Sequence, residues 1–244
     1  ALQLGIAGTT DAITINHFFY GDDPHSAYNP VQRVTFADGT TWDIAALLAR
    51  FDQAAPGGDG VTGTTGADTL SGGGSNDSLS GLQGNDSVSG GAGNDGLAGG
   101  DGDDTLDGGT GNDWLDGGTG NNVYQFGRGD GQDTVASIWN GDGTRQNVIA
   151  FKPGVAASDI VLHRVGDSQG GGNIARQLGI AGTPDAITIN HFFYGDDPHS
   201  AYNPVQRVTF ADGTSWDIAA LLARYDQAGP GGDGVTGTIV ADTL

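Results

Sequence analysis

Between residues 63 and 125 the chain places one apolar residue at the same point of every nine, with mostly glycine and polar residues between them. Each of the seven nine-residue blocks begins with glycine, and they share the pattern G-G-x-G-x-D-x-U-x, in which U is apolar. One inward residue per block predicts a short strand after a glycine-rich turn, and consecutive blocks predict a stack of parallel strands. The residues at the eighth position are Leu70, Leu79, Val88, Leu97, Leu106, Leu115 and Tyr124.

Outside these blocks apolar and polar residues alternate, which is typical of strands. Asp212-Gly213 lies between two such runs and predicts a hairpin, and Asp217 then predicts the N-cap of a short helix. The same two signals occur at Asp38-Gly39 and Asp43. The chain is therefore expected to be all-β, with β-rich capping regions that each end in a short helix. Strands are expected near residues 133–138, 147–151, 160–165, 174–180, 186–193 and 205–210.

A second repeat is much longer. Residues 3–70 recur as residues 177–244, and the two copies differ at six of 68 positions. This offset of 174 residues indicates either a tandem array or an engineered duplication. Residues 1–52 lack a preceding counterpart of residues 124–174, so we expect them to pack on the N-terminal edge of the stack or to pair with another molecule. The predicted organisation is half a capping region at 1–53, a linker at 54–62, the stack at 63–125, a capping region at 126–227, and a linker with the start of another stack at 228–244.

The composition indicates a preference for cations. The formal net charge is −21, and all 30 acidic residues are aspartate. Short carboxylates suit turns and oxygen-ligand sites, whereas nucleic acids and anionic membranes attract the lysine and arginine that this chain largely lacks. Disulfides are excluded because there is no cysteine, and no apolar run is long enough for a transmembrane segment. No cleavable signal peptide is visible, so export would need another route.

The sixth position of the blocks carries the candidate metal ligands. Calcium prefers about six to eight oxygen ligands, which one turn cannot supply but two stacked turns can. With two blocks per coil, each turn stacks on the turn two blocks later, so Asp68 is expected to act with Asp86, and the other aspartates likewise. About five calcium ions are expected on this basis, the last one at reduced charge because it uses Asn122. The sixth-position residues are Asp68, Asp77, Asp86, Asp95, Asp104, Asp113 and Asn122.

Backbone carbonyls of the turns are expected to complete the ligand sets, since glycine lets a turn curl its carbonyls inward. The glycines expected to contribute are Gly66, Gly73, Gly84, Gly91, Gly93, Gly100, Gly102, Gly109, Gly111, Gly118 and Gly120. The fifth-position residues expected to contribute their carbonyls are Asn76, Asn85, Asn94, Asp103 and Asn112. Asp130 and Asp133, which come after the last block, are secondary calcium candidates.

The same pattern predicts that folding depends on calcium. Aligned carboxylates repel one another in a stack, and the core has only one large apolar residue per block. Ordering a residue costs about 1–2 kcal/mol, which so small a core does not offset. Metal binding and folding are therefore expected to be one event, and the blocks are expected to be disordered without calcium.

The blocks resemble the haemolysin-type calcium-binding repeats of RTX proteins, and the segment from Tyr124 to Val135 resembles the flank that closes such repeats. Residues 147–226 resemble the haemolysin-type calcium-binding protein related region, and residues 1–52 resemble its latter half. The resemblance implies a right-handed parallel β-roll with calcium between alternate turns. It also implies type I secretion from a Gram-negative bacterium, calcium-driven folding outside the cell, and membership of a large toxin, adhesin or secreted enzyme.

Three departures from the repeat pattern matter most. Ser75 replaces the fourth-position glycine of its block, so that turn is expected to be distorted. Leu82 replaces a second-position glycine. Asn122 replaces the last aspartate and is expected to weaken or end the row of metal ligands.

Other motifs have simpler interpretations than the functions they suggest. The G-x-S-x-G match at residues 166–170 is interpreted as a hairpin loop, and Arg128 of the Arg-Gly-Asp tripeptide is expected to pair with nearby carboxylates. The G-x-G-x-x-G match at 91–96 belongs to the calcium turns. A zinc site remains an alternative to a polar loop for His17, His25, His191 and His199 with adjacent aspartates, Asp22, Asp23, Asp196 and Asp197. Trp42 and Trp216 are expected in the core, with carbohydrate stacking as the alternative.

We find no catalytic constellation and expect no enzyme activity in this chain. The leading hypothesis is a calcium-dependent structural repeat unit of an adhesin-like array at the surface of, or secreted by, a Gram-negative bacterium. Its partners would be calcium, neighbouring repeat units and a cell-surface glycan or protein. One alternative is a secretion and folding module beside a toxin or secreted enzyme, and another is a calcium-dependent glycan-binding module.

Overall fold

The computed structural model describes residues 2–5, 12–16, 30–43, 60–136, 144–166, 174–192, 199 and 203–227. The chain divides into two compact units, residues 1–53 and residues 54–244. Strands dominate the described residues, which contain a single α-helix, α2 (Ile218–Gln227). No helix in this part of the chain is long and apolar enough to cross a membrane.

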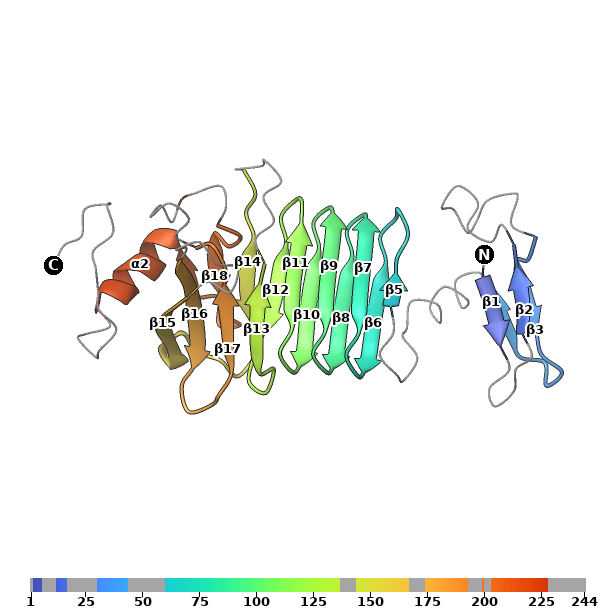
Figure 1. Cartoon of the computed structure of the whole chain (residues 1–244), viewed down its shortest axis with the longest axis horizontal. Helices are drawn as coiled ribbons and strands as arrows, with labels where there is room; N and C mark the ends of the chain where they lie inside the picture. The colour runs from blue at the N-terminus through green and yellow to red at the C-terminus, as the bar shows by residue number, and fades with distance from the viewer. Residues whose placement is uncertain are drawn as a thin grey trace. The chain divides into compact units, whose positions relative to one another are not determined.

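The nine-residue blocks form a parallel β-roll, as predicted (Figure 1). Successive strands alternate between two sheets, so each strand pairs with the strand two blocks away: Leu70 faces Val88, and Leu79 faces Leu97. Two blocks therefore make one coil. The strands of this region are β5 (Gly60–Thr62), β6 (Thr69–Gly74), β7 (Ser78–Gln83), β8 (Ser87–Ala92), β9 (Gly96–Asp101), β10 (Thr105–Thr110), β11 (Trp114–Gly118) and β12 (Val123–Phe126).

Parallel stacking continues beyond residue 125. The first sheet runs in the order β6-β8-β10-β12-β14-β18-β19 and the second in the order β5-β7-β9-β11-β13-β17-β16-β15. Trp114 pairs with Thr134 and Val123 with Val148, so the later coils keep the strand register. Their turns are longer than those of the nine-residue blocks, so the nine-residue period does not continue into them. The added elements are β13 (Gln132–Val135), β14 (Val148–Phe151), the 3-10 helix η2 (Ala157–Asp159), β15 (Ile160–Gly166), β16 (Ile174–Ile180), β17 (Ala186–Ile189), β18 (Arg207–Thr209) and β19 (Ser215–Asp217).

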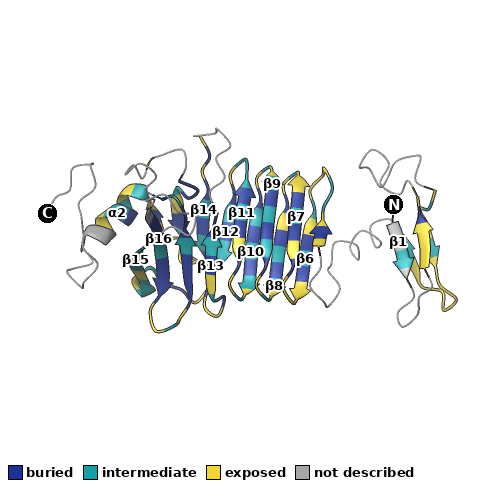
Figure 2. Cartoon of the chain, in the orientation of Figure 1, coloured by how far each residue is buried: buried dark blue, intermediate teal, exposed yellow. Residues whose placement is uncertain are grey.

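The core is a file of eighth-position residues between the two sheets (Figure 2). Leu106 and Leu115 are completely buried, and the first-position glycines face the same interior. From Phe126 onward the first position carries phenylalanine in the first sheet: Phe126, Phe151 and Phe210 lie in successive coils, with adjacent rings 6.1 and 5.1 Å apart. The later coils therefore replace glycine by aromatic packing, which supplies the apolar core that the glycine-rich coils lack.

The turns depend on left-handed backbone at the second and fourth positions. Gly91, Gly93, Gly109 and Gly111 all have φ between 90° and 140°. Ser75 and Leu82 adopt the same conformation, with φ of 107° and 78°. Their blocks keep the strand register, so the expected distortion at Ser75 does not occur; instead these two residues carry the strain that glycine avoids.

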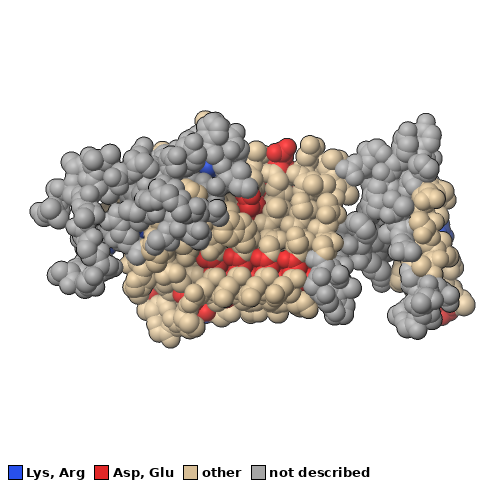
Figure 3. Space-filling model, in the orientation of Figure 1, with Lys and Arg blue, Asp and Glu red and all other residues tan. Residues whose placement is uncertain are grey.

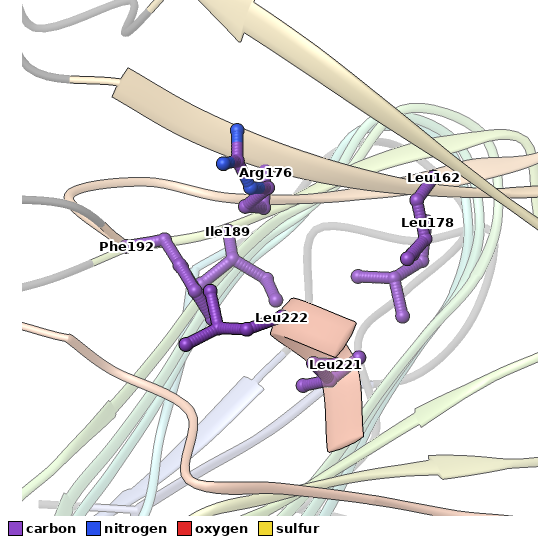
Figure 4. Close-up of a pocket in the computed structure, with 7 residues that line it drawn as sticks. All are labelled: Leu162, Arg176, Leu178, Ile189, Phe192, Leu221 and Leu222. Atoms are coloured by element: carbon purple, nitrogen blue, oxygen red, sulfur yellow. The ribbon is translucent and has the colours of Figure 1, made fainter. Parts of the chain in front are cut away.

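The capping elements match the sequence predictions. Arg207 pairs with Asp217 across the hairpin at Asp212-Gly213, and the Asp217 side chain accepts a hydrogen bond from the Ala220 N–H, 2.8 Å away, as an N-cap. Helix α2 packs on the strands of the second sheet and leaves a cavity of about 10 Å³, at the lower limit for one water molecule (Figure 4). Its lining residues are Leu162, Arg176, Leu178, Ile189, Phe192, Leu221 and Leu222.

The N-terminal unit repeats part of this capping sequence with a different environment. It contains two antiparallel pairs, and its hairpin at Asp38-Gly39 forms as predicted. Ile13 is 69% exposed, whereas Ile187, its counterpart 174 residues later, is fully buried against the roll. The helix predicted after Asp43 lies outside the described residues. The strands are β1 (Leu2–Gly5), β2 (Ala12–Ile15), β3 (Arg33–Thr35) and β4 (Thr41–Asp43).

Candidate calcium sites

The sixth-position side chains form two hydrogen-bonded rows inside the turns, here called the inner ladders. In each step, one side-chain oxygen accepts the backbone N–H of the sixth-position residue of the preceding coil. The Asp95 Oδ1 lies 2.8 Å from the Asp77 nitrogen, and the Asp104 Oδ1 lies 2.8 Å from the Asp86 nitrogen. The predicted pairing of turns two blocks apart is therefore present in the stack.

The two inner ladders differ in composition. The ladder beside the second sheet contains Asp77, Asp95, Asp113 and Asp133, and it ends where Ile187 follows Asp133 in the strand register. The ladder beside the first sheet contains Asp68, Asp86, Asp104, Asn122, Asn147 and Gln206. The hydrogen-bonded row thus continues past Asn122, although its last carboxylate is that of Asp104, and the expectation that Asn122 weakens or ends the row of metal ligands stays a prediction. An amide oxygen accepts the same N–H as a carboxylate oxygen, so the row continues without charge.

The second carboxylate oxygen is what sets the aspartates apart. The Oδ2 atoms of Asp86, Asp95, Asp104, Asp113 and Asp133 are buried, and none has a hydrogen-bond donor among the described residues. Burying an unpaired carboxylate oxygen is strongly unfavourable. These five atoms therefore require a cation or a proton.

The side-chain amides of the ladder beside the first sheet have hydrogen-bond partners and need neither a cation nor a proton. The Asn122 Nδ2 donates to the Thr119 carbonyl at 3.2 Å, the Asn147 Nδ2 to the Pro204 carbonyl at 2.9 Å, and the Gln206 Nε2 to the Asn203 carbonyl at 2.8 Å. An aspartate would present an acceptor oxygen to such a carbonyl, and two acceptors need a cation between them. The change from carboxylate to amide thus marks the change from unsatisfied to satisfied turns.

Backbone carbonyls lie next to the unpaired oxygens. A Cβ added to Gly90 would collide with the Asp95 Oδ2 and with the Gly108 carbonyl oxygen of the next coil. A Cβ on Gly99 would collide with the Asp104 Oδ2 and lie 2.9 Å from the Gly117 carbonyl oxygen. First-position glycines therefore leave room for carboxylate and carbonyl oxygens to converge. Carboxylate plus carbonyl oxygen is the donor set that calcium prefers.

The repeat pattern instead predicts carbonyl ligands from the second, fourth and fifth positions, and that assignment stays a prediction. In the structure, the second- and fourth-position carbonyls point along the stack: the Gly73 oxygen approaches Gly91, and the Gly93 oxygen approaches Gly111. The signal that could have found the first position is its invariance, since all seven blocks begin with glycine.

The fifth-position side chains form two further rows on the surface, together called the outer ladder. Their side-chain oxygens accept the backbone N–H of the following coil, the opposite direction to the inner ladders: Asn94 accepts from Asn112 at 2.8 Å, and Asn85 from Asp103 at 2.9 Å. One row contains Asn76, Asn94 and Asn112, and the other contains Asn85, Asp103 and Asn121. These residues therefore hold the coils together through their side chains, a role that the repeat pattern did not predict.

The first turn differs from the others. Thr64 stands where all later blocks except that of Leu82 have glycine, and its N–H and hydroxyl donate to the Asp68 Oδ2 at 2.6 and 3.1 Å. Asp68 is also only partly buried. Its carboxylate is thus already hydrogen-bonded, and the turn at Gly66 lacks the left-handed backbone of the later turns.

Burial raises the pKa values of aspartates in the inner ladders. It raises the pKa of Asp86 and Asp95, and it raises the pKa of Asp104 and of Asp113 to about 6. The pKa of Asp133 rises to about 8, mainly through burial. Charge repulsion along each row adds to these shifts, as expected for carboxylates that lack a counter-ion.

The charged side chains of the roll are all negative. Residues 51–127 contain no lysine or arginine, and a row of acidic side chains runs along the surface of the roll in Figure 3. No group of three or more His, Cys, Asp or Glu side chains converges on a point within the described ranges. A cation in the roll would therefore rely on few carboxylates and several backbone carbonyls.

The remaining candidates from the sequence have mostly structural roles. Asp130 is buried and paired with Lys152, and Arg128 forms an ion pair with Asp159 at 2.8 Å, as expected. Trp216 is buried against Phe210, so it is a core residue. Strand β16 rather than a helix comes after the G-x-S-x-G match, most of which lies outside the described residues.

Most residues of the alternative zinc site lie outside the described residues. His17, His25, Asp22, Asp23, Asp196 and Asp197 lie outside the described residues. His199 is described and exposed, and His191 has a left-handed backbone with φ of 56°. The zinc alternative therefore stays a hypothesis.

Comparison with known families agrees with this architecture. The family model of the RTX calcium-binding nonapeptide repeat matches residues 62–97 and 98–134. The family model of the haemolysin-type calcium binding protein related domain matches residues 2–46 and 177–220. No curated protein matches the chain. The chain thus carries calcium-binding nonapeptide repeats of the RTX type between two regions that match the haemolysin-type calcium binding protein related domain.

Proposed function

We propose that this chain is a calcium-dependent folding unit of a large secreted or cell-surface bacterial protein. Calcium ions between successive coils would bridge the sixth-position carboxylates to carbonyl oxygens, and the ordered roll would then act as a rigid structural repeat. The observation that carries the proposal is the row of buried Oδ2 atoms without donors, next to amides that are satisfied at equivalent positions.

The inner ladders suggest which steps hold calcium. Steps with two carboxylates are Asp68/Asp86, Asp86/Asp104, Asp77/Asp95, Asp95/Asp113 and Asp113/Asp133, and the step Asp104/Asn122 has one. The first-position carbonyls complete the ligand sets in this proposal. About five ions then fit the carboxylate pairs, with Asp133 continuing the row that the nine-residue pattern ends at Asp113.

Export is consistent with the affinity expected of such sites. Extracellular calcium modules bind at about 10⁻⁴–10⁻³ M, well above cytosolic calcium, so the roll would stay unfolded inside the cell and fold after secretion. The long repeat of 174 residues supports an adhesin-like array whose partners include neighbouring units. The sequence of the whole gene distinguishes an adhesin-like array from a folding module of a toxin or enzyme. Many further copies of the 174-residue unit would favour the array, and a neighbouring catalytic domain would favour the folding module.

A matched pair of substitutions tests the metal sites. Asp104→Asn removes a buried carboxylate that takes part in two steps, whereas Asp103→Asn makes the same change in the outer ladder one residue away. We expect Asp104→Asn to lose one or two calcium ions in equilibrium dialysis and to keep its hydrogen bond to the Asp86 N–H. Asp103→Asn should bind as many ions as the wild type.

The wild-type measurement comes first. Circular dichroism in chelator and then in millimolar calcium should show a large gain of β-structure. If the wild-type chain binds no calcium, or if both variants lose the same number of ions, the proposal is wrong.

A further inference from the structure

Lys152 is the only lysine in the chain, and its charge acts on Asp133, the last carboxylate of one inner ladder. It directly follows β14, whose Phe151 pairs with Phe126 of β12. Its backbone N–H donates to the Phe126 carbonyl at 2.9 Å, so the residue continues the parallel pairing of the first sheet.

The ammonium group of Lys152 joins carboxylates from two other coils. Its Nζ lies 2.7 Å from the Asp107 Oδ1 and 2.9 Å from the Asp130 Oδ2. Asp107 belongs to β10, and Asp130 lies in the turn before β13. Asp130 is buried, and Asp107 and Lys152 are about three-quarters buried, so this pair of charged contacts is screened less than a surface ion pair.

Gly127 provides the path for the lysine side chain. A Cβ at Gly127 would lie 2.9 Å from the Lys152 Cβ and 3.1 Å from its Cδ, so any larger residue would displace the stem. The Gly127 N–H also donates to the Asp130 Oδ2 at 2.7 Å, which fixes that carboxylate toward the ammonium. Asp107 is fixed in a similar way, since its Oδ1 accepts the Gly109 N–H at 3.1 Å. The cation position is thus built by three separate coils.

The surroundings of this position are strongly acidic. Asp133, the last carboxylate of its inner ladder, is fully buried and its Oδ2 has no donor among the described residues. Burial chiefly raises the pKa of Asp133. The hydrogen bond from the Asp113 N–H and the charge of Lys152 oppose this rise, whereas the charges of Asp113 and Asp130 add to it. One positive side chain is therefore shared by Asp107 and Asp130 directly and by Asp133 through the field.

We infer that Lys152 is a tethered cation that replaces a calcium ion at the end of the ion row. This inference rests on the proposed calcium binding of the roll. An ammonium needs only about three acceptors, whereas calcium needs six to eight oxygens. In the coil that begins at Phe126, phenylalanine fills the space that the first-position glycine leaves open in the earlier turns, and the ammonium neutralises Asp107 and Asp130 with few acceptors.

Removal of the ammonium should uncover a calcium site. In the Lys152→Met variant of the full chain, the Asp107 and Asp130 carboxylates are left without their cation, and we expect one additional calcium ion per chain in native mass spectrometry and equilibrium dialysis. Lys152→Arg keeps the charge and should bind the wild-type number. Arg128→Met removes a positive charge from an exposed ion pair with Asp159 and should also leave the number unchanged.

A double variant identifies the ligands. Lys152→Met combined with Asp107→Asn should return the number of bound ions to that of the wild type. A Lys152→Met variant that binds the wild-type number of ions, or that fails to fold in millimolar calcium, would overturn the inference, because calcium is expected to substitute for the ammonium. A wild-type chain that binds no calcium would instead contradict the proposed function itself.

Discussion

At the scale of single residues, glycine has two separate roles in this chain. At the second and fourth positions it adopts a left-handed backbone, which Ser75 and Leu82 adopt only with strain. At the first position its φ is ordinary, and what matters is the missing side chain, because the sixth-position carboxylate of the same block fills that space. The first role can be inferred from the repeat pattern, but the second depends on where a side chain five residues later points.

Two glycine substitutions separate these roles. Gly90→Ala places a Cβ on the Asp95 Oδ2 and the Gly108 carbonyl oxygen, so we expect it to displace ligands and to destabilise the calcium-bound roll by about 1–3 kcal/mol. Gly74→Ala makes the same change where nothing lies within 4 Å and φ is not positive. It should be neutral or stabilise by up to about 1 kcal/mol, because alanine lowers the entropy of the unfolded chain. Thermal unfolding in millimolar calcium checks both; equal losses would rule out the steric explanation.

At the scale of elements, the stack contains two kinds of coil. From β6 to β11 the turns present carboxylates and the first position is glycine, so the coils have little apolar core and unpaired buried oxygens. In the later coils of the first sheet, amides replace carboxylates and phenylalanine replaces glycine. We therefore expect the later coils to need less help from a metal than the earlier ones.

Asn122 lies at the boundary between these coils, and Asn122→Asp should move the boundary by one step. Without calcium, the new carboxylate faces the Thr119 carbonyl in place of a donor, and an unsatisfied buried acceptor costs about 1–3 kcal/mol. With calcium, the step to Asp104 gains a second carboxylate and should bind more tightly. The measurements are thermal unfolding in chelator and calcium titration by calorimetry.

Asn76→Asp provides the control for this change, because it alters an exposed member of the outer ladder whose oxygen still accepts the Asn94 N–H. It should change both measurements little. An Asn122→Asp variant as stable in chelator as the wild type would show that the amide hydrogen bond does not replace a cation.

At the scale of the whole molecule, the acidic charge is expected to couple folding to both calcium and protons. The folded pKa values of Asp104 and Asp113, about 6, and of Asp133, about 8, lie above the value near 4 expected for an unfolded aspartate. Between about pH 4 and pH 8 the calcium-free folded state therefore binds more protons than the unfolded state. Its stability is greatest below pH 4 and falls as the pH rises through this window.

Calcium should reverse this dependence, because it binds the deprotonated carboxylates and competes with protons. We expect β-structure in chelator to increase from pH 8 to pH 4, and the calcium concentration needed for folding to rise as the pH falls from 7 to 5. Circular dichroism over both ranges tests this. A calcium-free chain whose β-structure increases with pH would have the opposite linkage to the one that these carboxylates predict.

The sequence alone determines much of the architecture, because the features concerned are local. The nine-residue period sets the strand positions, the pairing of turns two blocks apart and the inward file of leucines, and the Asp-Gly and Asp217 signals set the hairpin and the N-cap. The sixth-position aspartates are also evident, since six of the seven blocks repeat them. These predictions need only the periodicity of a strand and the chemistry of a turn.

The tertiary structure alone decides where the row of carboxylates ends and which residues continue it. Asn147 and Gln206 join the inner ladder from turns whose lengths the period does not predict, and Lys152 reaches Asp107 from 45 residues away. The copies of the capping sequence make the same point: Ile187 is buried because β13 lies beside it, whereas Ile13 is exposed in an otherwise identical strand. Burial and pairing between distant segments depend on the neighbours that the stack supplies, and no local pattern specifies them.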